Sequence, residues 1–537
     1  MRRLAPLLAL LLAACATADP QANLTPAERW WSHVAILGAD DMEGRNAGSP
    51  GHERAALYVA DQFRRLGLKP AGVAGQASPY FQPVPLVVQR VLPDRSSVAL
   101  VADGVATPLT LGQDLTLGAR IAQPAAVTDA PLHFIGYGLH MPDAGHDDFA
   151  GVDLRGKIAV TLAGGPRGAP ANLRAHASRS QWEHLQRLGA VGLITIANPK
   201  SMDVPWARTS PAALQPQMRQ ADPALNPVKD TAFTAALNPA SAPRLFARSG
   251  RTFPELLAIA DKAEPLPRFA LNQSLRATVS VETTRTSSPN VVALLPGADP
   301  KLKAEYVVLT AHLDGLGVGT PVDGDAIFNG AMDNATGVAS LIEQARALTA
   351  GAPPRRSVLF VAVTAEEKGL LGSQFFAERP TVPRSALAAN VNMDMFMPIR
   401  PADSVYVLGE SESTLGALAR QAGAETGVAV VPDPAPGQMS FVRSDQYSFI
   451  RTGVPALSVK IGYRPDTPEA AADRAWRAER YHGPKDDLSQ PIDRESAVRF
   501  NGYMAALIRS VADAPTRPTW LPTSFFRRFA APPTPAR

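Results

Sequence analysis

The sequence predicts an α/β protein with a mostly parallel central sheet flanked by helices and interrupted by a β-rich insert. Apolar runs at 306–314, 357–367 and 387–395 have the character of buried strands. Helix-like stretches lie between them at 336–350 and 370–379. Strand–helix alternation of this kind is typical of a parallel sheet covered by helices. The chain has 537 residues, too many for one compact core, so two or more domains are expected.

The main domain is predicted to begin in the N-terminal part of the chain, over residues 24–95. Residues 25–37 have the pattern of a helix, with Thr25 as N-cap and Glu28 three positions later as the second half of a capping box. A second helix is expected over 52–68. Its apolar stripe consists of Ala56, Val59, Ala60 and Phe63.

Residues 96–279 differ from the flanking segments in their sequence pattern and are predicted to form the inserted domain. Strand-like runs separated by Gly and Pro turns occupy residues 130–140, 156–165 and 191–199. A helix is expected over 178–190, and the Pro-rich stretch 200–250 is expected to form extended loops. The main domain then resumes over 280–515, and a Pro-rich tail follows at 516–537.

The only cysteine, Cys15, ends a segment that resembles an export signal. Two arginines and an apolar run, too short to serve as a permanent membrane anchor, lead to the sequence LAAC. This ending resembles the bacterial lipobox, so residues 1–15 are expected to be a lipoprotein signal peptide and Cys15 the lipidated residue. Ala16, where an Asp would favour the inner membrane, favours anchoring to the outer membrane by analogy. The alternative is an ordinary cleaved signal and a soluble periplasmic or secreted protein.

Composition argues against nucleic acid as a partner. The net charge is only +4, and the arginines are scattered along the chain. Hydrophobic residues make up 45% and charged residues 19%, which is a globular composition.

The histidines are concentrated in the first third of the chain. After residue 184 only His312 and His482 remain. His312 and Asp314 are two positions apart, so on an extended strand both would point to one face. Asp314 could then accept the second imidazole N–H and fix the tautomer that offers the other nitrogen to a metal. A lone strand histidine is usually structural, but the many carboxylates nearby favour a metal ligand here.

Those carboxylates follow the predicted strands. Glu366 and Glu367 stand together at the mouth of a buried strand, where like charges repel and burial is costly. Asp394 lies within an apolar run, and Asp333 lies in a Gly-flanked loop before a helix, where it could alternatively be an N-cap. With two histidines, this set suits two zinc ions that share one carboxylate, although other divalent ions would also fit.

The sequence resembles the co-catalytic zinc exopeptidases, the family of bacterial leucyl aminopeptidase and glutamate carboxypeptidase II. The matching stretches, in order, are AHLDGLG, NGAMDNATG, AEEKGLLGS, NMDM and YHGPKDD. DDMEGRNAGSPGHERAALYVADQF resembles the N-terminal segment of that family, and IGYGL, DDFAGVDLRGKIAV and LGAVGLITI resemble its protease-associated domain. The resemblance covers nearly all of residues 24–515.

The resemblance implies a role for each site residue. It assigns the metal ligands as Asp333 bridging two zinc ions, His312 and Asp394 on one, and Glu367 and His482 on the other. Glu366 would be the general base, and Tyr481 would steady the oxyanion or, alternatively, only pack. Gln446 departs from the family, which often has His in a Ser-Asp-His pattern there.

The predicted function is therefore a zinc aminopeptidase that removes N-terminal residues from peptides in the bacterial cell envelope. Its expected partners are peptide substrates and, through the lipid anchor, a membrane. A carboxypeptidase of the glutamate type and a non-catalytic lipoprotein binding module of the same fold are the alternatives.

Overall fold

The structure is a computed structural model that describes residues 21, 23–119, 125–166, 168–200, 202, 205–212, 215–226, 233–262 and 264–530. The predicted signal segment 1–15, its lipidation site Cys15 and the end of the predicted tail, 531–537, lie outside the described residues. Within the described part, each helix is too short or too polar to cross a membrane.

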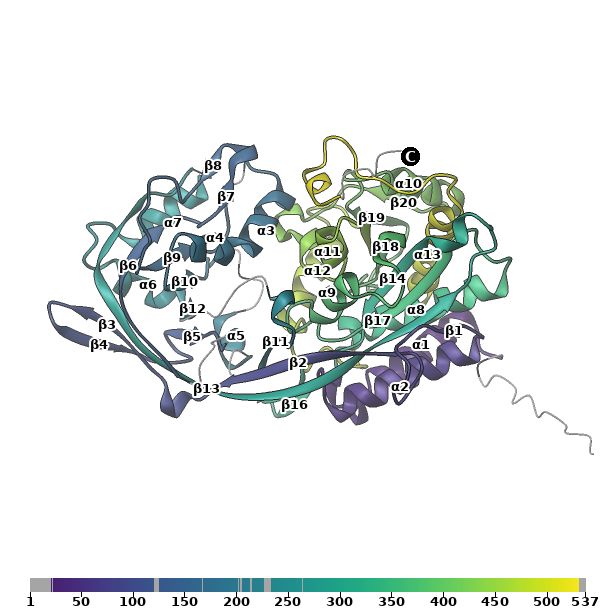
Figure 1. The fold of residues 1–537 in the computed structure, drawn as a ribbon, viewed down its shortest axis with the longest axis horizontal. Coiled ribbons are helices and arrows are strands. Elements are labelled where there is room, and N and C mark those ends of the chain that lie inside the picture. The colour runs from purple at the N-terminus through teal and green to yellow at the C-terminus, as the bar shows by residue number, and fades with distance from the viewer. Residues whose placement is uncertain are drawn as a thin grey trace, which may run out of the picture.

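The chain begins with the two helices that the sequence predicts, α1 (Pro26–Leu37) and α2 (Pro50–Arg65). Thr25 accepts a hydrogen bond from the Glu28 N–H, and the Glu28 carboxylate accepts one from the Thr25 N–H, which completes the capping box. The predicted apolar stripe of α2 is buried. Both helices pack on the central sheet (Figure 1).

The centre of that sheet is parallel, as predicted. Its middle strands, in spatial order, are β17 (Ser357–Val363), β14 (Tyr306–His312), β18 (Leu387–Asn392) and β21 (Ala456–Ile461). Antiparallel strands flank this centre on both sides. One side has β13 (Arg268–Leu295), β2 (Phe81–Val91), β11 (Gln217–Gln220) and β1 (Lys69–Pro70); the other has β19 (Ser404–Leu408) and β20 (Ala429–Val431), which is parallel to β19.

Alternate side chains of the central strands enter different cores, because successive residues of a strand point to opposite faces. On β14, Val307 and Leu309 contact one core and Val308 contacts the other. The first core includes α1 and α2 with α8 (Thr336–Ala350), α10 (Leu415–Thr426) and α13 (Arg494–Asp513). The second includes α9 (Leu371–Glu378) and α11 (Gln446–Arg451). The middle strands are therefore buried on both faces.

The inserted residues enclose a core of their own on the left of Figure 1. Their main strands are β3 (Ser97–Ala102), β4 (Val105–Leu109), β5 (Leu115–Leu117), β6 (Ala125–Ile135), β9 (Ile158–Leu162), β10 (Gly192–Ile196) and β12 (Thr234–Leu237). Their helices are α3 (Ala171–Arg179), α4 (Gln181–Arg187), α5 (Trp206–Ala212), α6 (Ala242–Phe246) and α7 (Phe253–Asp261). The 28-residue strand β13 pairs with β6 in the insert and with β17 in the main sheet, so it ties the two bodies together.

Short elements complete the chain. They are the hairpins β7 (His140–Met141) with β8 (His146–Asp147) and β15 (Gly317–Val322) with β16 (Asp325–Phe328), and helix α12 (Pro468–Glu479).

Two local predictions in the insert were wrong. The stretch 200–250, predicted as extended loops, contains α5, β11, β12 and α6. Met218, Leu237 and Phe246 are buried there, and packing against the sheets overrides the effect of the prolines. The helix predicted over 178–190 is two helices, since α3 ends at Arg179 and α4 begins at Gln181.

Candidate metal centre

The predicted site residues lie together at the carboxyl edge of the parallel strands. His312 is the last residue of β14, the Glu366–Glu367 pair follows β17, and Asp394 follows β18. Because parallel strands end at the same edge of a sheet, these side chains converge there. Asp394 and Asp314, predicted to lie on the strands themselves, lie just beyond the strand ends.

Asp333 lies between the two histidines. Its Oδ1 is 3.1 Å from His312 Nε2, and its Oδ2 is 3.4 Å from His482 Nε2. Its predicted alternative as a helix N-cap was wrong, because Ala335 precedes α8 and makes no side-chain cap. The two carboxylate oxygens therefore face two different ligand groups.

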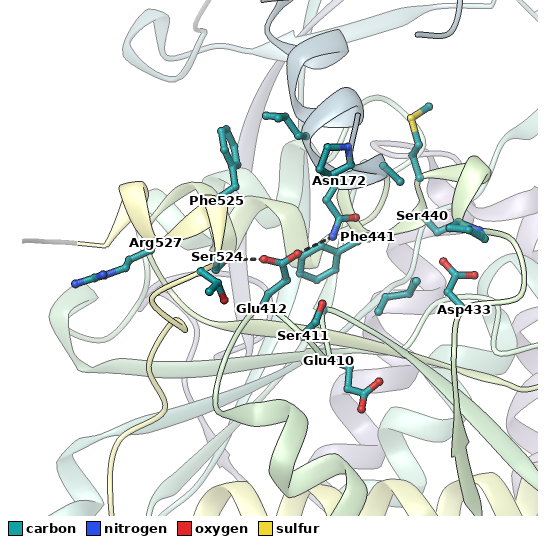
Figure 2. A pocket seen from close by; sticks show the side chains of 18 of the residues that line it. Asn172, Glu410, Ser411, Glu412, Asp433, Ser440, Phe441, Ser524, Phe525 and Arg527 are labelled. Atoms are coloured by element: carbon teal, nitrogen blue, oxygen red, sulfur yellow. Dashed lines mark hydrogen bonds between the residues drawn. The ribbon is translucent and has the colours of Figure 1, made fainter. Parts of the chain in front are cut away.

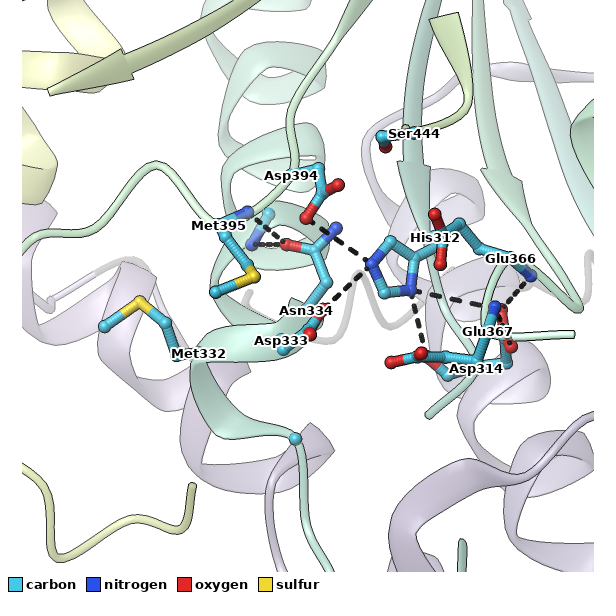
Figure 3. Close-up of polar contacts among 12 residues, drawn as sticks. His312, Asp314, Met332, Asp333, Asn334, Glu366, Glu367, Asp394, Met395 and Ser444 are labelled. Carbon is cyan, nitrogen blue, oxygen red and sulfur yellow. Dashed lines mark hydrogen bonds and ion pairs between the residues drawn. The ribbon is translucent and has the colours of Figure 1, made fainter. Parts of the chain in front are cut away.

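Each histidine is accompanied by a second acid. His312 Nε2 is 3.6 Å from Asp394 Oδ1, and His482 Nε2 is 3.4 Å from Glu367 Oε2. Figure 3 shows His312 with Asp333 and Asp394 on one side of its ring. His312, Asp333 and Asp394 thus form one group, and Asp333, Glu367 and His482 form another, in each of which the ligand atoms lie within 4.8 Å of one another.

Asp314 acts differently from the prediction. His312 Nδ1 lies 3.1 Å from the backbone oxygen of Asp314 and 4.0 Å from its carboxylate. The carboxylate instead accepts hydrogen bonds from the backbone N–H groups of Glu366, at 2.9 Å, and Glu367, at 3.2 Å. The backbone carbonyl of residue 314 therefore orients the imidazole, and its side chain holds the turn that carries the two glutamates.

Two charged residues that support the site were not predicted from the sequence. The buried Arg45 guanidinium donates to the backbone oxygens of Leu37, Leu313, Asn329 and Gly330. Asp486 accepts from the N–H groups of Met332 (2.7 Å) and Asp333 (3.0 Å). Arg45 thus fixes the chain on both sides of the site, after His312 and before Asp333, while Asp486 holds the Asp333 loop directly.

Burial makes this group of acids hard to ionise without a cation. It raises the pKa of Glu366 and raises the pKa of Glu367 to about 7. Burial also acts against ionisation of Asp333, but the nearby His312 and His482 outweigh it and hold the pKa of Asp333 below its usual range. A divalent cation would favour the charged form of each of these acids.

The donor set fits zinc. Imidazole and carboxylate are the usual ligands of catalytic zinc. His312 Nε2 and Asp394 Oδ1 are buried, and neither makes a well-oriented hydrogen bond to any described residue. A cation between these two buried atoms would satisfy both of them.

Tyr481 and Gln446 complete the surroundings of the centre. The Tyr481 ring lies 3.9 Å from that of His482 and 6.3 Å from that of Trp476, so this residue packs as well as facing the site. Gln446 Oε1 accepts from Asn392 Nδ2 at 2.8 Å, and Gln446 Nε2 donates to the Phe441 oxygen at 2.9 Å. Gln446 therefore joins the end of β18 to the loop before α11.

A separate cleft of about 1060 Å³ lies between α3, the loop after β19 and the C-terminal segment (Figure 2). None of the predicted site residues lines it. Glu412, drawn at its centre, accepts hydrogen bonds from Asn172 at 2.9 Å and from Ser524 at 2.6 Å. The bond from Asn172 joins the insert to the main domain, and the bond from Ser524 joins the C-terminal segment to it.

Residues 290–508 match the sequence profile of peptidase family M28. This segment is thus similar to the M28 peptidases, and residues 290–508 are called the M28 domain below. This domain contains every predicted metal ligand, and its assignment to a peptidase family confirms the broader resemblance drawn from the motifs. The narrower likeness to leucyl aminopeptidase and glutamate carboxypeptidase II, and the protease-associated character of the insert, stay predictions.

Individual relatives match parts of the chain. It is 38% identical over 106 residues to a probable zinc metalloprotease of Pyrenophora teres f. teres, covering 20% of this chain and 22% of that protein. It is 25% identical over 256 residues to aminopeptidase YwaD of Bacillus subtilis, covering 46% of this chain and 50% of that protein. The chain thus matches from about a fifth to half of the length of these relatives.

The fold of the M28 domain and the insert together is similar to that of a solved structure. The aminopeptidase from Aneurinibacillus sp. strain AM-1 superposes with a TM-score of 0.54 at 19% identity, covering 91% of this chain and 95% of that one. This likeness shows that the overall α/β fold is shared.

Proposed function

We propose that this chain is a zinc-dependent aminopeptidase that removes N-terminal residues from peptides in the bacterial cell envelope. The M28 domain, the likeness to aminopeptidase YwaD and the donor set at the sheet edge support the activity. The lipobox-like ending at Cys15 supports anchoring to the envelope, with the outer membrane favoured.

The arrangement of Asp333 is the observation that carries this proposal. One of its oxygens faces His312 and the other faces His482. A carboxylate presented in this way suits a bridge between two ions, each of which would have two further protein ligands. His312 and Asp394 would hold one ion, and Glu367 and His482 the other.

Zinc bound there would polarise the scissile carbonyl and make a water molecule acidic. Glu366 is the residue of this chain that would take the water proton and pass it to the leaving amine. One oxygen of Glu366 lies within 4.8 Å of both a His312 nitrogen and a Glu367 oxygen. Burial raises the pKa of Glu366, which brings a carboxylate closer to the range of an effective proton shuttle.

Tyr481 would donate a hydrogen bond to the oxygen that gains negative charge. Burial raises its pKa well above the usual value, so the hydroxyl keeps its proton at neutral pH. Contact with the His482 ring places Tyr481 beside one of the two ligand groups.

The test is the Glu366→Gln variant, which removes the base and keeps the size of the side chain. We expect zinc content to match the wild type and kcat on leucyl-p-nitroanilide to fall by at least about a hundredfold. Glu378→Gln is the matched control, because Glu378 is half-buried at the end of α9 and pairs with Arg384 outside the site. Wild-type turnover by the Glu366→Gln variant would remove Glu366 from its role.

A further inference from the structure

Glu366 and Glu367 lie in a loop whose backbone is held in an unfavourable conformation. The loop runs from Thr364, which follows β17, to Leu370, which precedes α9. Ala365 and Leu370 have φ angles of 54° and 64°, in the left-handed region that residues other than glycine rarely adopt. Such residues cluster at functional sites and persist only where the surrounding structure fixes them. Groups outside the loop must therefore hold it in shape.

The side chain of Asn290, on the neighbouring strand β13, closes this loop at its base. β13 and β17 pair as far as Val291 and Ala362, and β17 ends one residue later. Just beyond that point, Asn290 Oδ1 accepts a hydrogen bond from the Thr364 N–H at 2.9 Å, and Asn290 Nδ2 donates to the Gly372 oxygen at 3.0 Å. One amide group therefore ties the two ends of the loop together.

The amide group of Asn290 is itself fixed in orientation. Asn290 is fully buried, and its Nδ2 also donates to Gln82 Oε1 at 2.9 Å. Because the nitrogen faces two acceptors and the oxygen faces an N–H group, only this orientation of the amide satisfies all three bonds. Gly372 makes the close approach possible, since a Cβ there would lie 2.1 Å from the Thr364 oxygen and 2.6 Å from Asn290 Oδ1. The contact therefore depends on an amide that faces a glycine.

Two further contacts fix the loop from other residues. Ser288, two positions before Asn290 on β13, has its Oγ 2.6 Å from Thr364 Oγ1. The Asp314 carboxylate accepts hydrogen bonds from the backbone N–H groups of the two glutamates (Figure 3). Asp314 thus holds the part of the loop that carries the glutamates, and Asn290 holds its two ends.

We propose that Asn290 is a positioning residue for the peptidase reaction, which holds the loop so that Glu366 keeps the place from which it can act as the base. This inference rests on the proposed aminopeptidase function. The hydrogen bonds of Asn290 go to Gln82, Thr364 and Gly372, so it acts on Glu366 through the backbone. Without these bonds the loop can relax from its left-handed conformations, and the base is displaced.

The first test compares zinc-loaded Asn290→Leu with the wild type. Leucine is similar in size to asparagine and removes both bonds to the loop. We expect kcat on leucinamide to fall by about a hundredfold with little change in KM, because a displacement of about 1 Å near the reacting atoms has an effect of this size. Gln344→Leu is the matched control and should keep the wild-type kcat. Gln344 is a buried amide of α8 whose Nε2 donates to the Asn501 oxygen at 3.1 Å, outside the loop.

A comparison of two leaving groups separates positioning of the base from a general loss of folded enzyme. Leucinamide releases ammonia, a basic amine that needs a proton, whereas leucyl-p-nitroanilide releases a weakly basic aniline. A smaller folded fraction lowers both rates equally. A displaced Glu366 should instead lower the ratio of kcat on leucinamide to kcat on leucyl-p-nitroanilide, by at least about fivefold in Asn290→Leu. An unchanged ratio in Asn290→Leu, or the same fall in Gln344→Leu, would overturn the inference.

Gly372→Ala tests the same contact without removing a hydrogen-bonding group. The added methyl group would push the Asn290 amide and the Thr364 carbonyl away from residue 372. Alanine is a better helix former than glycine in the first turn of α9, which favours folding of the variant. The ratio for the two leaving groups should fall as in Asn290→Leu, and the double variant should add little to either change. A wild-type ratio in Gly372→Ala would contradict the inference.

Hydrogen exchange tests the contact without any substrate. In Asn290→Leu, the backbone amides of residues 364–372 should exchange at least about tenfold faster than in the wild type, and Gln344→Leu should leave them unchanged. If the wild type cleaves neither substrate, the proposed function is overturned, and faster exchange would still show that Asn290 holds the loop. If the wild type is active while Asn290→Leu keeps both the wild-type exchange and the wild-type ratio, the inference alone is overturned.

Discussion

The two halves of the metal centre differ in how far they are enclosed. In the half formed with Asp394, the His312 side chain is 1% exposed and ends a central strand. In the half formed with Glu367, the His482 side chain is 35% exposed, and His482 lies in the loop between α12 and α13. A small cavity lined by Leu316 and Phe328 opens beside Glu367 and His482 of this second half.

Because the two halves differ in exposure to solvent, we expect them to have different roles. The enclosed half is built into the sheet, so its geometry is fixed by the fold itself. The open half, with Tyr481 beside it, is the side from which water and substrate can arrive. Asp333 belongs to both halves, so its loss should disturb both of them.

The largest effect is expected from Asp333→Asn. This change keeps the size of the side chain and removes the charge that both halves share. We expect zinc content to fall below one ion per chain and kcat/KM to fall by at least about a thousandfold. Metal analysis and leucyl-p-nitroanilide assays on the same preparation measure both. Retention of two zinc ions would show that each half binds independently of Asp333.

Arg45→Met should weaken both halves through the backbone. The change leaves the carbonyl groups of Leu313, Asn329 and Gly330 without their donor, and each unpaired buried carbonyl is costly. We expect the free energy of unfolding of the zinc-free chain to fall by about 3 kcal/mol, measured by urea denaturation.

The control for that change is Arg54→Met. Arg54 lies on α2 and forms an exposed ion pair with Glu43, so this variant should lie within about 0.5 kcal/mol of the wild type. Equal stability of Arg45→Met and Arg54→Met would show that the Arg45 hydrogen bonds do not hold the site.

Tyr481→Phe tests the open half alone. The phenyl ring keeps the contacts with His482 and Trp476 and loses only the hydroxyl. If the hydroxyl donates to the developing oxyanion, kcat should fall by about a hundredfold with little change in KM or zinc content. Steady-state kinetics at saturating zinc measure the effect, and an unchanged kcat would leave Tyr481 with a packing role only.

The smallest effect concerns the order in which the ions leave. Because His482 is more exposed than His312, the ion on the Glu367 side should dissociate to a chelator at least about tenfold faster. Stopped-flow transfer of zinc to a coloured chelator should therefore show two phases, and His482→Ala should abolish the fast one. Loss of the slow phase in that variant would show instead that the ion on the His482 side is the slower one to dissociate.

The sequence predicts the site residues at the strand ends better than the residues that hold their backbone in place. His312, Glu366, Glu367 and Asp394 follow apolar strands, and polar residues at the ends of parallel strands converge on one edge. Arg45 and Asp486 lie within motifs that resemble the family, but their role depends on backbone groups far away in the sequence. No local pattern marks an arginine that donates to distant carbonyl oxygens.

The prediction that the Asp314 carboxylate orients His312 was wrong for a similar reason, because it also depends on contacts that the local sequence does not show. Two-residue spacing predicts that His312 and Asp314 share a face only while the strand continues, and β14 ends at His312. Beyond that point the backbone turns, and the Asp314 carboxylate bonds to the N–H groups of the glutamate pair. Similarly, most of α3 lies before the helix predicted over 178–190, and its Asn172 and His176 contact residues that are distant in the sequence.

The most direct test of the central claim is a crystal structure of the zinc-loaded chain with anomalous data collected at the zinc absorption edge. We expect two anomalous peaks about 3.5–4 Å apart, one beside His312 and Asp394 and one beside Glu367 and His482, with Asp333 between them. A single peak, or two peaks that do not share Asp333, would contradict it.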